Sequence, residues 1–229
     1  MKVELGSLLE YAKEALGTVI IVDVFRAFTT AAVAFDRGAK SIILVAGVDE
    51  ARSLREQGVG DILMGEEGGA MPDGFDLGNS PAEASQHDFS GKTVIQSTRA
   101  GTVGVAAAEG ADNIFLGSLV VAQATVEAIR ADNPELVTVV AMGEQGVVRT
   151  DEDEQCGLFL RNLLEGRRPD GYAIGRLIME GNATRKFFDS SQPQYQPQDV
   201  DLALEVDRYP FAMKVSREGG LLVARKYPG

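Results

Sequence analysis

Acidic and hydroxyl side chains follow four apolar runs in this 229-residue sequence. Asp23 ends VIIVD, Glu66 follows ILMG, Ser97 begins STRAGT, and Glu144 lies in GEQG at 143–146. Ligands of open α/β sheets gather beyond the carboxyl ends of the strands. If the four runs are parallel strands, these side chains meet in one polar site. Carboxylates there would hold a cation, and hydroxyl and amide groups would receive an anion.

The segment at 65–81, GEEGGAMPDGFDLGNSP, contains five glycines and four acids. Glycine loses much conformational freedom on folding and adjacent carboxylates repel, so stability alone does not favour this composition. Long loops between regular elements are usually either functional or disordered. Met71, Phe75 and Leu77 give the segment apolar side chains to bury, which favours an ordered loop. We expect this loop to hold a hard cation close to its backbone.

Asp23 and the STRAGT segment each allow two interpretations. Asp23 precedes Arg26 by three residues, so it is a metal ligand or nucleophile, or it caps the helix that follows. Ser97, Thr98 and the amides after them form either a cradle for phosphate or an ordinary helix cap. In the first case Arg99 adds a bidentate contact to the anion.

Four consecutive acids, DEDE at 151–154, are typical of a solvated helix start, although one of them could turn inward to a cation. Mg²⁺ requires only one or two carboxylates in addition to water and substrate oxygens. A single histidine, His87, and a single cysteine, Cys156, argue against a zinc site. One cysteine also excludes an internal disulfide and suits a reducing cytoplasm.

The composition limits the classes of partner. The formal net charge is −12, which argues against nucleic acid and anionic membrane surfaces. The first fifteen residues lack the charged and apolar regions of a secretory signal. The apolar run at 19–22 is far too short to cross a bilayer.

Apolar runs alternate with helical patterns along most of the chain. Strands are predicted at 18–23, 41–45, 61–64, 93–96, 113–116, 137–142, 211–215 and 221–225. Helices are predicted at 26–37, 49–57, 99–109, 120–131, 153–164, 172–180 and about 182–188, with a further helix start at Ser80-Pro81. This pattern predicts an α/β fold with a mixed, largely parallel sheet covered by helices on both faces. We expect one domain over residues 1–229, with a possible C-terminal subregion from about residue 151.

Six short motifs occur in order between residues 23 and 156. They are DVxRA at 23–27, GExGG at 65–69, DLGNSP at 76–81, TxxGT at 98–102, GSL at 117–119 and EDxxC at 152–156. In this ordered set, of which DLGNSP is the specific member, the chain resembles the 2-phosphosulfolactate phosphatase (ComB-like) family. It departs from the family pattern at Glu67, where an arginine is usual, and at Arg99 in the STRAGT segment.

The resemblance implies a ComB-like α/β fold and a magnesium-dependent phosphatase. The implied reaction is hydrolysis of 2-phospho-3-sulfolactate to 3-sulfolactate and phosphate, a step toward coenzyme M. The departures at Glu67 and Arg99 exchange charges near the site, and such an exchange could move specificity.

We hypothesise a cytoplasmic, Mg²⁺-dependent phosphatase that acts on a small anionic phosphomonoester. The catalytic candidates are Asp23, Glu66 and Asp76, and the metal-binding candidates are these three and Asp153. The substrate-binding candidates are Arg26, Ser97, Thr98, Arg99, Gly101 and Thr102. Either Asp23 or a water molecule activated by the cation attacks phosphorus.

Two other classes of protein fit the same residues. A non-catalytic protein could bind an anionic metabolite on this scaffold through the glycine-rich loops. A structural subunit could carry the acidic runs as solubilising surface only. Homo-oligomerisation is a general expectation for proteins of this kind.

Overall fold

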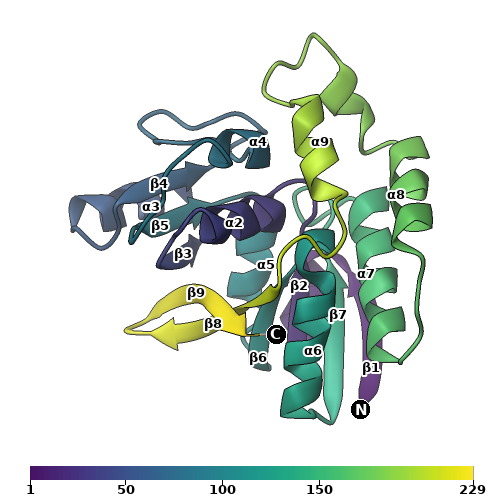
Figure 1. Cartoon of the computed structure of the whole chain (residues 1–229). Helices are drawn as coiled ribbons and strands as arrows, with labels where there is room; N and C mark the ends of the chain where they lie inside the picture. Colours follow the sequence, from purple (N-terminus) through teal and green to yellow (C-terminus); the bar gives the residue numbers. More distant parts are fainter. Residues whose placement is uncertain (229) are drawn as a thin grey trace.

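The computed structural model describes residues 1–228, and Figure 1 shows their arrangement. In chain order the elements are β1 (Lys2–Ser7), α1 (Leu8–Glu14), β2 (Gly17–Val22), α2 (Ala27–Asp36), β3 (Ser41–Val45), α3 (Val48–Glu56), β4 (Ile62–Gly65), α4 (Pro81–Ala84), β5 (Thr93–Ser97), α5 (Gly101–Ala107), β6 (Ala111–Gly117), η1 (Leu119–Val121), α6 (Ala122–Asp132), β7 (Leu136–Ala141), α7 (Asp151–Leu164), α8 (Gly171–Glu180), η2 (Arg185–Phe188), α9 (Pro197–Ala203), β8 (Phe211–Glu218) and β9 (Leu221–Pro228). The two η elements are short 3₁₀ helices.

Within residues 1–228 the strands form one nine-stranded sheet in the order β1-β7-β2-β6-β8-β9-β3-β5-β4. The first four strands of this order are parallel to one another, and so are the last three. The C-terminal hairpin β8–β9 joins these two parallel blocks through antiparallel pairs. The mixed, largely parallel sheet predicted from the sequence is confirmed.

The two parallel blocks have opposite directions along the sheet, because three successive pairings between β6 and β3 are antiparallel. Figure 1 shows β3, β4 and β5 lying at a steep angle to β2, β6 and β7. The bend brings the carboxyl ends of both blocks together: the Gly101 amide, after β5, donates to Asp23, after β2, at 2.8 Å. The site therefore lies between two blocks of a bent sheet rather than along one straight edge.

Helices cover both faces of the sheet. Along β2, Val19 and Ile21 pack in the cluster that contains α2 and α5, whereas Ile20 and Val22 pack in the cluster that contains α6 and α7. A strand buried on both faces reads as a continuous apolar run, which is why β2 was predictable. No helix in residues 1–228 combines the length and apolar character needed to cross a membrane.

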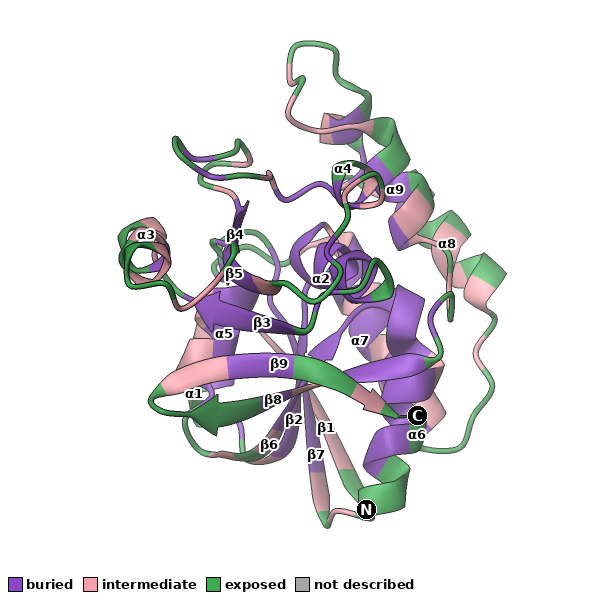
Figure 2. Ribbon diagram, turned by 60° about the vertical axis from the view of Figure 1, so that its left-hand side comes forward, coloured by how far each residue is buried: buried purple, intermediate pink, exposed green. Residues whose placement is uncertain are grey.

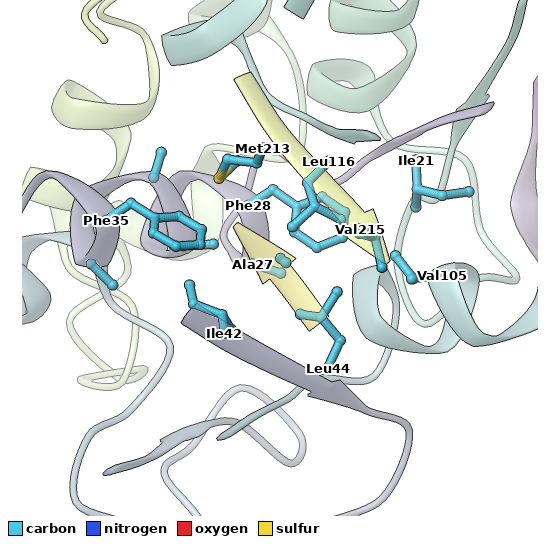
Figure 3. Packing of buried hydrophobic residues seen from close by; sticks show 14 of the residues in the cluster. Ile21, Ala27, Phe28, Phe35, Ile42, Leu44, Val105, Leu116, Met213 and Val215 are labelled. Carbon is cyan, nitrogen blue, oxygen red and sulfur yellow. The ribbon is translucent and has the colours of Figure 1, made fainter. Parts of the chain in front are cut away.

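Helix α2 is buried on all sides, because every residue from Ala27 to Phe35 is inaccessible or nearly so. Figure 3 shows Phe28 and Phe35 of α2 among side chains of β3, β6 and β8. Figure 2 shows that α2 and the central strands are buried, whereas the tip of the β8–β9 hairpin is exposed. Asp23 and Arg26, at the start of α2, are consequently attached to the most buried helix.

Several helices and strands differ from those predicted from the sequence. β1 and α1 were not predicted at all, because an edge strand is only half buried and its polar residues interrupt the apolar pattern. α9 lies in the segment whose glutamines and prolines gave no helical periodicity. The helix expected near 182–188 is the short 3₁₀ turn η2.

Candidate active site

A cavity of about 120 Å³ lies where four strand-end loops meet. The residues that line it are Asp23, Phe25 and Arg26 after β2, Glu66, Gly68 and Gly69 after β4, Thr98, Arg99 and Ala100 after β5, and Gly143, Glu144 and Gln145 after β7. The predicted meeting of these four segments in one polar site is confirmed. The remaining lining residues are Asn79, near the end of the long loop after β4, and Lys186 and Tyr195, which come from a segment outside the four loops.

Asp23 is buried at this cavity and both its carboxylate oxygens accept backbone hydrogen bonds. The Ala27 amide donates to Oδ1 at 3.0 Å, and the Gly101 amide donates to Oδ2 at 2.8 Å. Burial raises the pKa of Asp23 to about 6, and the nearby Glu66 carboxylate adds to the rise. The two amides and the Lys186 ammonium oppose the rise. Asp23 thus accepts the first amide of α2, although Arg26 is the N-cap residue, and it is also a fixed carboxylate at the cavity.

Glu66 is held in the same way from the neighbouring block. The Gly69 amide donates to Oε2 at 2.7 Å, and the Arg99 amide donates to Oε1 at 2.8 Å. Each oxygen keeps a second lone pair for another partner. Asp23 and Glu66 are therefore two carboxylates whose orientation is set by backbone amides before any ligand binds.

The STRAGT segment does not present the free amide cradle that the sequence suggested. The amides of Arg99 and Gly101 donate to the protein's own carboxylates, Glu66 and Asp23. A Cβ on Gly101 would lie 2.8 Å from Asp23 Oδ2, so only glycine permits this approach. The backbone of this segment therefore positions two acids, and Gly101 must be small for that purpose.

Thr98 and Thr102 satisfy each other locally. The Thr102 amide donates to the Thr98 hydroxyl at 3.2 Å, and the Thr102 hydroxyl donates to the Thr98 carbonyl at 2.9 Å. The Thr98 amide in turn donates to the Thr102 hydroxyl at 2.9 Å. Ser97 is the buried last residue of β5, and its carbonyl accepts from the Glu66 amide. Of the two interpretations, local hydrogen bonding describes the Thr98 and Thr102 hydroxyls, and of Ser97, Thr98 and Thr102 only Thr98 lines the cavity.

Two acids of the DEDE run, Glu152 and Asp153, are buried and turn inward. The sequence allowed such an orientation for one of the four acids. Asp153 accepts the amides of Val24 and Gly143 at 2.8 Å each, so it ties the β2 and β7 loops together. Burial, with repulsion from Glu152 and Asp23, raises the pKa of Asp153 well above its usual range. Glu152 is also buried, and its Oε2 atom has no hydrogen-bond partner among the described residues. Burial raises the pKa of Glu152 to about 7.

Arg26 lines the cavity but is already engaged by the protein. Its Nη1 donates to Asp199 Oδ2 at 2.9 Å and to the Gln194 carbonyl at 2.8 Å, and its Nη2 donates to the Gly69 carbonyl at 2.9 Å. Arg26 and Asp199 are both buried. The Phe25–Arg26 peptide bond is cis. Arg26 thus links the loops of the cavity to α9.

Asp199 attaches α9 to the DLGNSP motif as well. Its Oδ1 accepts the Ser80 hydroxyl at 2.5 Å and the Ala82 amide at 3.2 Å. Helices α4 and α9 accordingly lie side by side in Figures 1 and 2. Ser80 also caps α4 through the Glu83 amide, as predicted.

The structure does not bring Asp76 to the cavity. Its Oδ2 accepts the Leu63 amide at 2.7 Å and the Arg55 guanidinium at 2.6 Å, on the side of β4 where α3 lies. Although partial burial opposes it, these two donors lower the pKa of Asp76. Asp76 braces the long loop against β4. In the same loop Phe75 is buried as expected, whereas Met71 is exposed.

Among the residues at or behind the cavity that were absent from the predicted site, those with polar side chains suited to a ligand include Asn79, Glu152, Lys186 and Tyr195. Asn79 and Glu152 lie in two of the recognised motifs, so a motif signal existed for them. Lys186 and Tyr195 lie in a segment without a motif, and the chain topology alone brings them to the cavity.

The donor set fits a hard cation. Asp23 and Glu66 supply fixed carboxylates, and the partnerless Glu152 Oε2 and Asn79 Oδ1 atoms are buried acceptors. No cluster of three or more histidine, cysteine, aspartate or glutamate side chains in residues 1–228 forms a ready-made metal site. Mg²⁺ does not require such a cluster, because water and substrate oxygens complete its coordination.

Known proteins share this sequence pattern. The family model for 2-phosphosulpholactate phosphatase matches residues 7–195. The chain is 33% identical over 204 residues to a probable 2-phosphosulfolactate phosphatase of Bacillus subtilis, with 87% of each chain covered. It is 36% identical over 175 residues to one of Caldicellulosiruptor saccharolyticus, covering 75% of this chain and 72% of the relative. A Thermus thermophilus relative with the same description is 36% identical over 146 residues, covering 63% and 61%.

Proposed function

Because this chain belongs to the 2-phosphosulfolactate phosphatase family of phosphoric monoester hydrolases, we propose that it uses Mg²⁺ to hydrolyse 2-phospho-3-sulfolactate to 3-sulfolactate and phosphate. The observation that carries the proposal is the pair of amide-held carboxylates, Asp23 and Glu66, at one cavity. A family of hydrolases favours an enzyme over the non-catalytic binding protein that the sequence also allowed.

Asp23 and Glu66 would hold the cation, and Glu152 and Asn79 would offer acceptors behind it. When bound, Mg²⁺ would neutralise charge on the phosphoryl oxygens and on the leaving oxygen. The amides of Ala27, Gly69, Arg99 and Gly101 fix both carboxylates beforehand, so little reorganisation is needed during the reaction. The pKa of about 6 for Asp23 in the metal-free site would fall as a cation favours its ionised form.

The substrate brings phosphate, carboxylate and sulfonate groups to a chain of net charge −12, so local positive charge has to receive them. Arg99 lines the cavity with a side chain that is 48% exposed, and its Nη1 lies 3.9 Å from Glu67 Oε1. This loose contact leaves the Arg99 guanidinium free to turn toward an anion. Arg26 shapes the cavity wall instead, since the protein already engages both its terminal nitrogens.

The test is phosphate release from a panel of small phosphomonoesters that includes 2-phospho-3-sulfolactate and phospholactate. Each compound is assayed with Mg²⁺ and with EDTA. We expect release from 2-phospho-3-sulfolactate that requires Mg²⁺, and slower release from phospholactate, which lacks the sulfonate. Equal rates in EDTA would contradict the role of the metal. Release from a different compound alone would identify that compound, and not 2-phospho-3-sulfolactate, as the substrate. If the folded protein released phosphate from none of the compounds, the proposed reaction would be refuted.

A further inference from the structure

The cavity contains three cationic side chains, and the protein engages them unequally. Arg26 forms a buried ion pair with Asp199 and donates to two carbonyl oxygens. Arg99 is near Glu67 at the exposed edge. Among residues 1–228, no carboxylate forms an ion pair with Lys186 and no acceptor takes a hydrogen bond from it. Lys186 is therefore the cation of the cavity that is most available to a ligand.

Aromatic rings hold the Lys186 side chain in place. Its Nζ lies 5.0 Å from the centroid of the Tyr195 ring and 5.9 Å from that of Phe187. Tyr195 and Phe187 pack edge to face at 5.3 Å, and Phe187 packs on Phe25 at 5.1 Å. An ammonium group over aromatic faces is attracted to them without losing its hydrogen-bonding capacity. The amine is positioned but its three donors remain for another acceptor.

The residues that share the cavity with Lys186 indicate which group of the substrate it contacts. Its side chain lines the same cavity as Asp23 and Glu66, the carboxylates proposed to hold the cation. The group of the substrate that binds at that cation is the phosphoryl group. A compact ammonium on a flexible stem suits contact with several phosphoryl oxygens as a point charge.

We infer that Lys186, from the 3₁₀ turn η2, binds the phosphoryl group of the substrate in the cavity that it shares with the backbone-held carboxylates Asp23 and Glu66. This inference rests on the proposed phosphatase function and adds a residue that no motif indicated. It assigns a role to the segment 185–199, in which Tyr195 packs on Phe187 and Lys186 of η2 and Asp199 binds Arg26 of the cavity wall. Lys186 would also offset charge that develops on the phosphoryl oxygens in the transition state.

The test compares Lys186→Gln, Lys186→Arg and the matched control Arg185→Gln. Arg185 is the preceding residue of the same turn, is exposed, and does not line the cavity. Binding of inorganic phosphate is measured by calorimetry in Mg²⁺, and kcat and KM are measured with the preferred phosphomonoester. We expect Lys186→Gln to weaken phosphate binding by about 10- to 100-fold, the range for a charged hydrogen-bond partner. Lys186→Arg should lose less phosphate affinity than Lys186→Gln. Arg185→Gln should change the phosphate affinity less than twofold.

Phosphate binding separates this inference from the proposed reaction. The inference stands if the wild type binds phosphate, Lys186→Gln binds it more weakly, and Arg185→Gln binds it as well as the wild type. This holds even where no phosphomonoester is hydrolysed. Unchanged phosphate affinity in Lys186→Gln would overturn it, and so would a wild-type protein that binds no phosphate. A fall in kcat with unchanged phosphate affinity would also overturn it, because Lys186 would then act by some means other than holding the group. Thermal unfolding of each variant checks that η2 remains folded.

Discussion

The carboxylates of the site differ in how the protein compensates their burial. Asp23, Glu66 and Asp153 each accept two backbone amides. Glu152 is buried with Oε2 lacking any partner in the described part of the chain. An unpaired buried acceptor is costly unless a ligand supplies the missing interaction. Glu152 is the residue at which function and stability oppose each other most directly.

Glu152→Gln should make the metal-free protein more stable. The neutral amide removes a carboxylate whose pKa is raised from 4.5 to about 7 by burial, which corresponds to about 3 kcal/mol above pH 7. We therefore expect the free energy of unfolding in EDTA at pH 7.5 to rise by up to about 3 kcal/mol, as measured in urea. The same variant should bind Mg²⁺ about 10-fold more weakly, because one acceptor charge is lost.

A matched variant at Asp151, a half-buried acid of the same helix turn, provides the comparison. Asp151 accepts the Asn182 amide at the surface, outside the cavity. Asp151→Asn should change neither metal affinity nor stability in the direction seen for Glu152→Gln. Lower stability of Glu152→Gln than of the wild type in EDTA would contradict an uncompensated carboxylate at this position.

At the residue scale the sequence indicated part of the site. Asp23, Glu66, Thr98 and Arg99 line the cavity as expected, because each follows a recognisable apolar strand. The hydrogen-bond partners of these residues could not be predicted from the sequence. Amides of the STRAGT segment donate to the protein's own acids, Glu66 and Asp23, and are not free. Asp76 was selected for its motif, but a motif does not specify which way a side chain points, and it points to Arg55.

At the element scale, the junction of β5 and α5 determines the position of Asp23. Gly101 begins α5, its amide donates to Asp23, and a Cβ there would lie 2.8 Å from Asp23 Oδ2 and 2.9 Å from Phe28 Cζ. Both neighbours are buried and cannot move outward. The spacing of strand, loop and helix therefore sets the site more tightly than any one side chain.

Gly101→Ala should displace the Asp23 carboxylate. We expect a loss of stability of about 1–3 kcal/mol from overpacking, together with a fall in kcat/KM of about 10- to 100-fold. Gly175→Ala in α8 is the matched control, because a Cβ there meets nothing within 4 Å. That change should raise stability by about 0.5–1 kcal/mol through helix propensity and leave kcat/KM unchanged. Equal activity of the two variants would refute the close approach at Gly101.

Elements with strong apolar periodicity were predicted well, and those without it were not. The buried strands β2, β3, β5 and β7 agree with the sequence within about two residues because both of their faces are covered. β1 is an edge strand and was missed, since half burial leaves its polar residues in place. α9 is a short helix held by the contacts of Asp199 rather than by its own pattern.

At the scale of the whole molecule, the order of the elements along the chain did not predict which distant segments lie together. The C-terminal hairpin β8–β9 lies in the middle of the sheet, and its antiparallel pairs turn the two parallel blocks toward each other. Nothing local in residues 211–228 specifies this position. The same long-range folding brings Lys186 and Tyr195 to loops more than eighty residues earlier in the chain, such as those around Asp23 and Glu66.

The concentration of acids at the site should make the stability of the metal-free protein depend on pH. The pKa is raised to about 6 for Asp23, to about 7 for Glu152, and well above 3.8 for Asp153. With these raised values the folded state binds more protons than the unfolded state between about pH 4 and pH 7. Stability therefore falls as pH rises through this window.

We expect the protein in EDTA to be about 2–4 kcal/mol more stable at pH 5 than at pH 7.5. Urea unfolding at the two pH values measures the difference. Excess Mg²⁺ should reverse much of it at pH 7.5, because a ligand that binds only the folded state stabilises that state. Greater stability at pH 7.5 than at pH 5 in EDTA would show that the buried carboxylates do not carry the raised pKa values.

The central claim is that the Asp23 carboxylate, held between Ala27 and Gly101, makes this chain a metal-dependent phosphatase. The most direct measurement is phosphate release from 2-phospho-3-sulfolactate in Mg²⁺ by the wild type, Asp23→Asn and the control Asp76→Asn. We expect Asp23→Asn to lose at least about 100-fold in kcat/KM with its circular dichroism unchanged, and Asp76→Asn to remain within about threefold of the wild type. Near-normal phosphate release by folded Asp23→Asn would contradict the account.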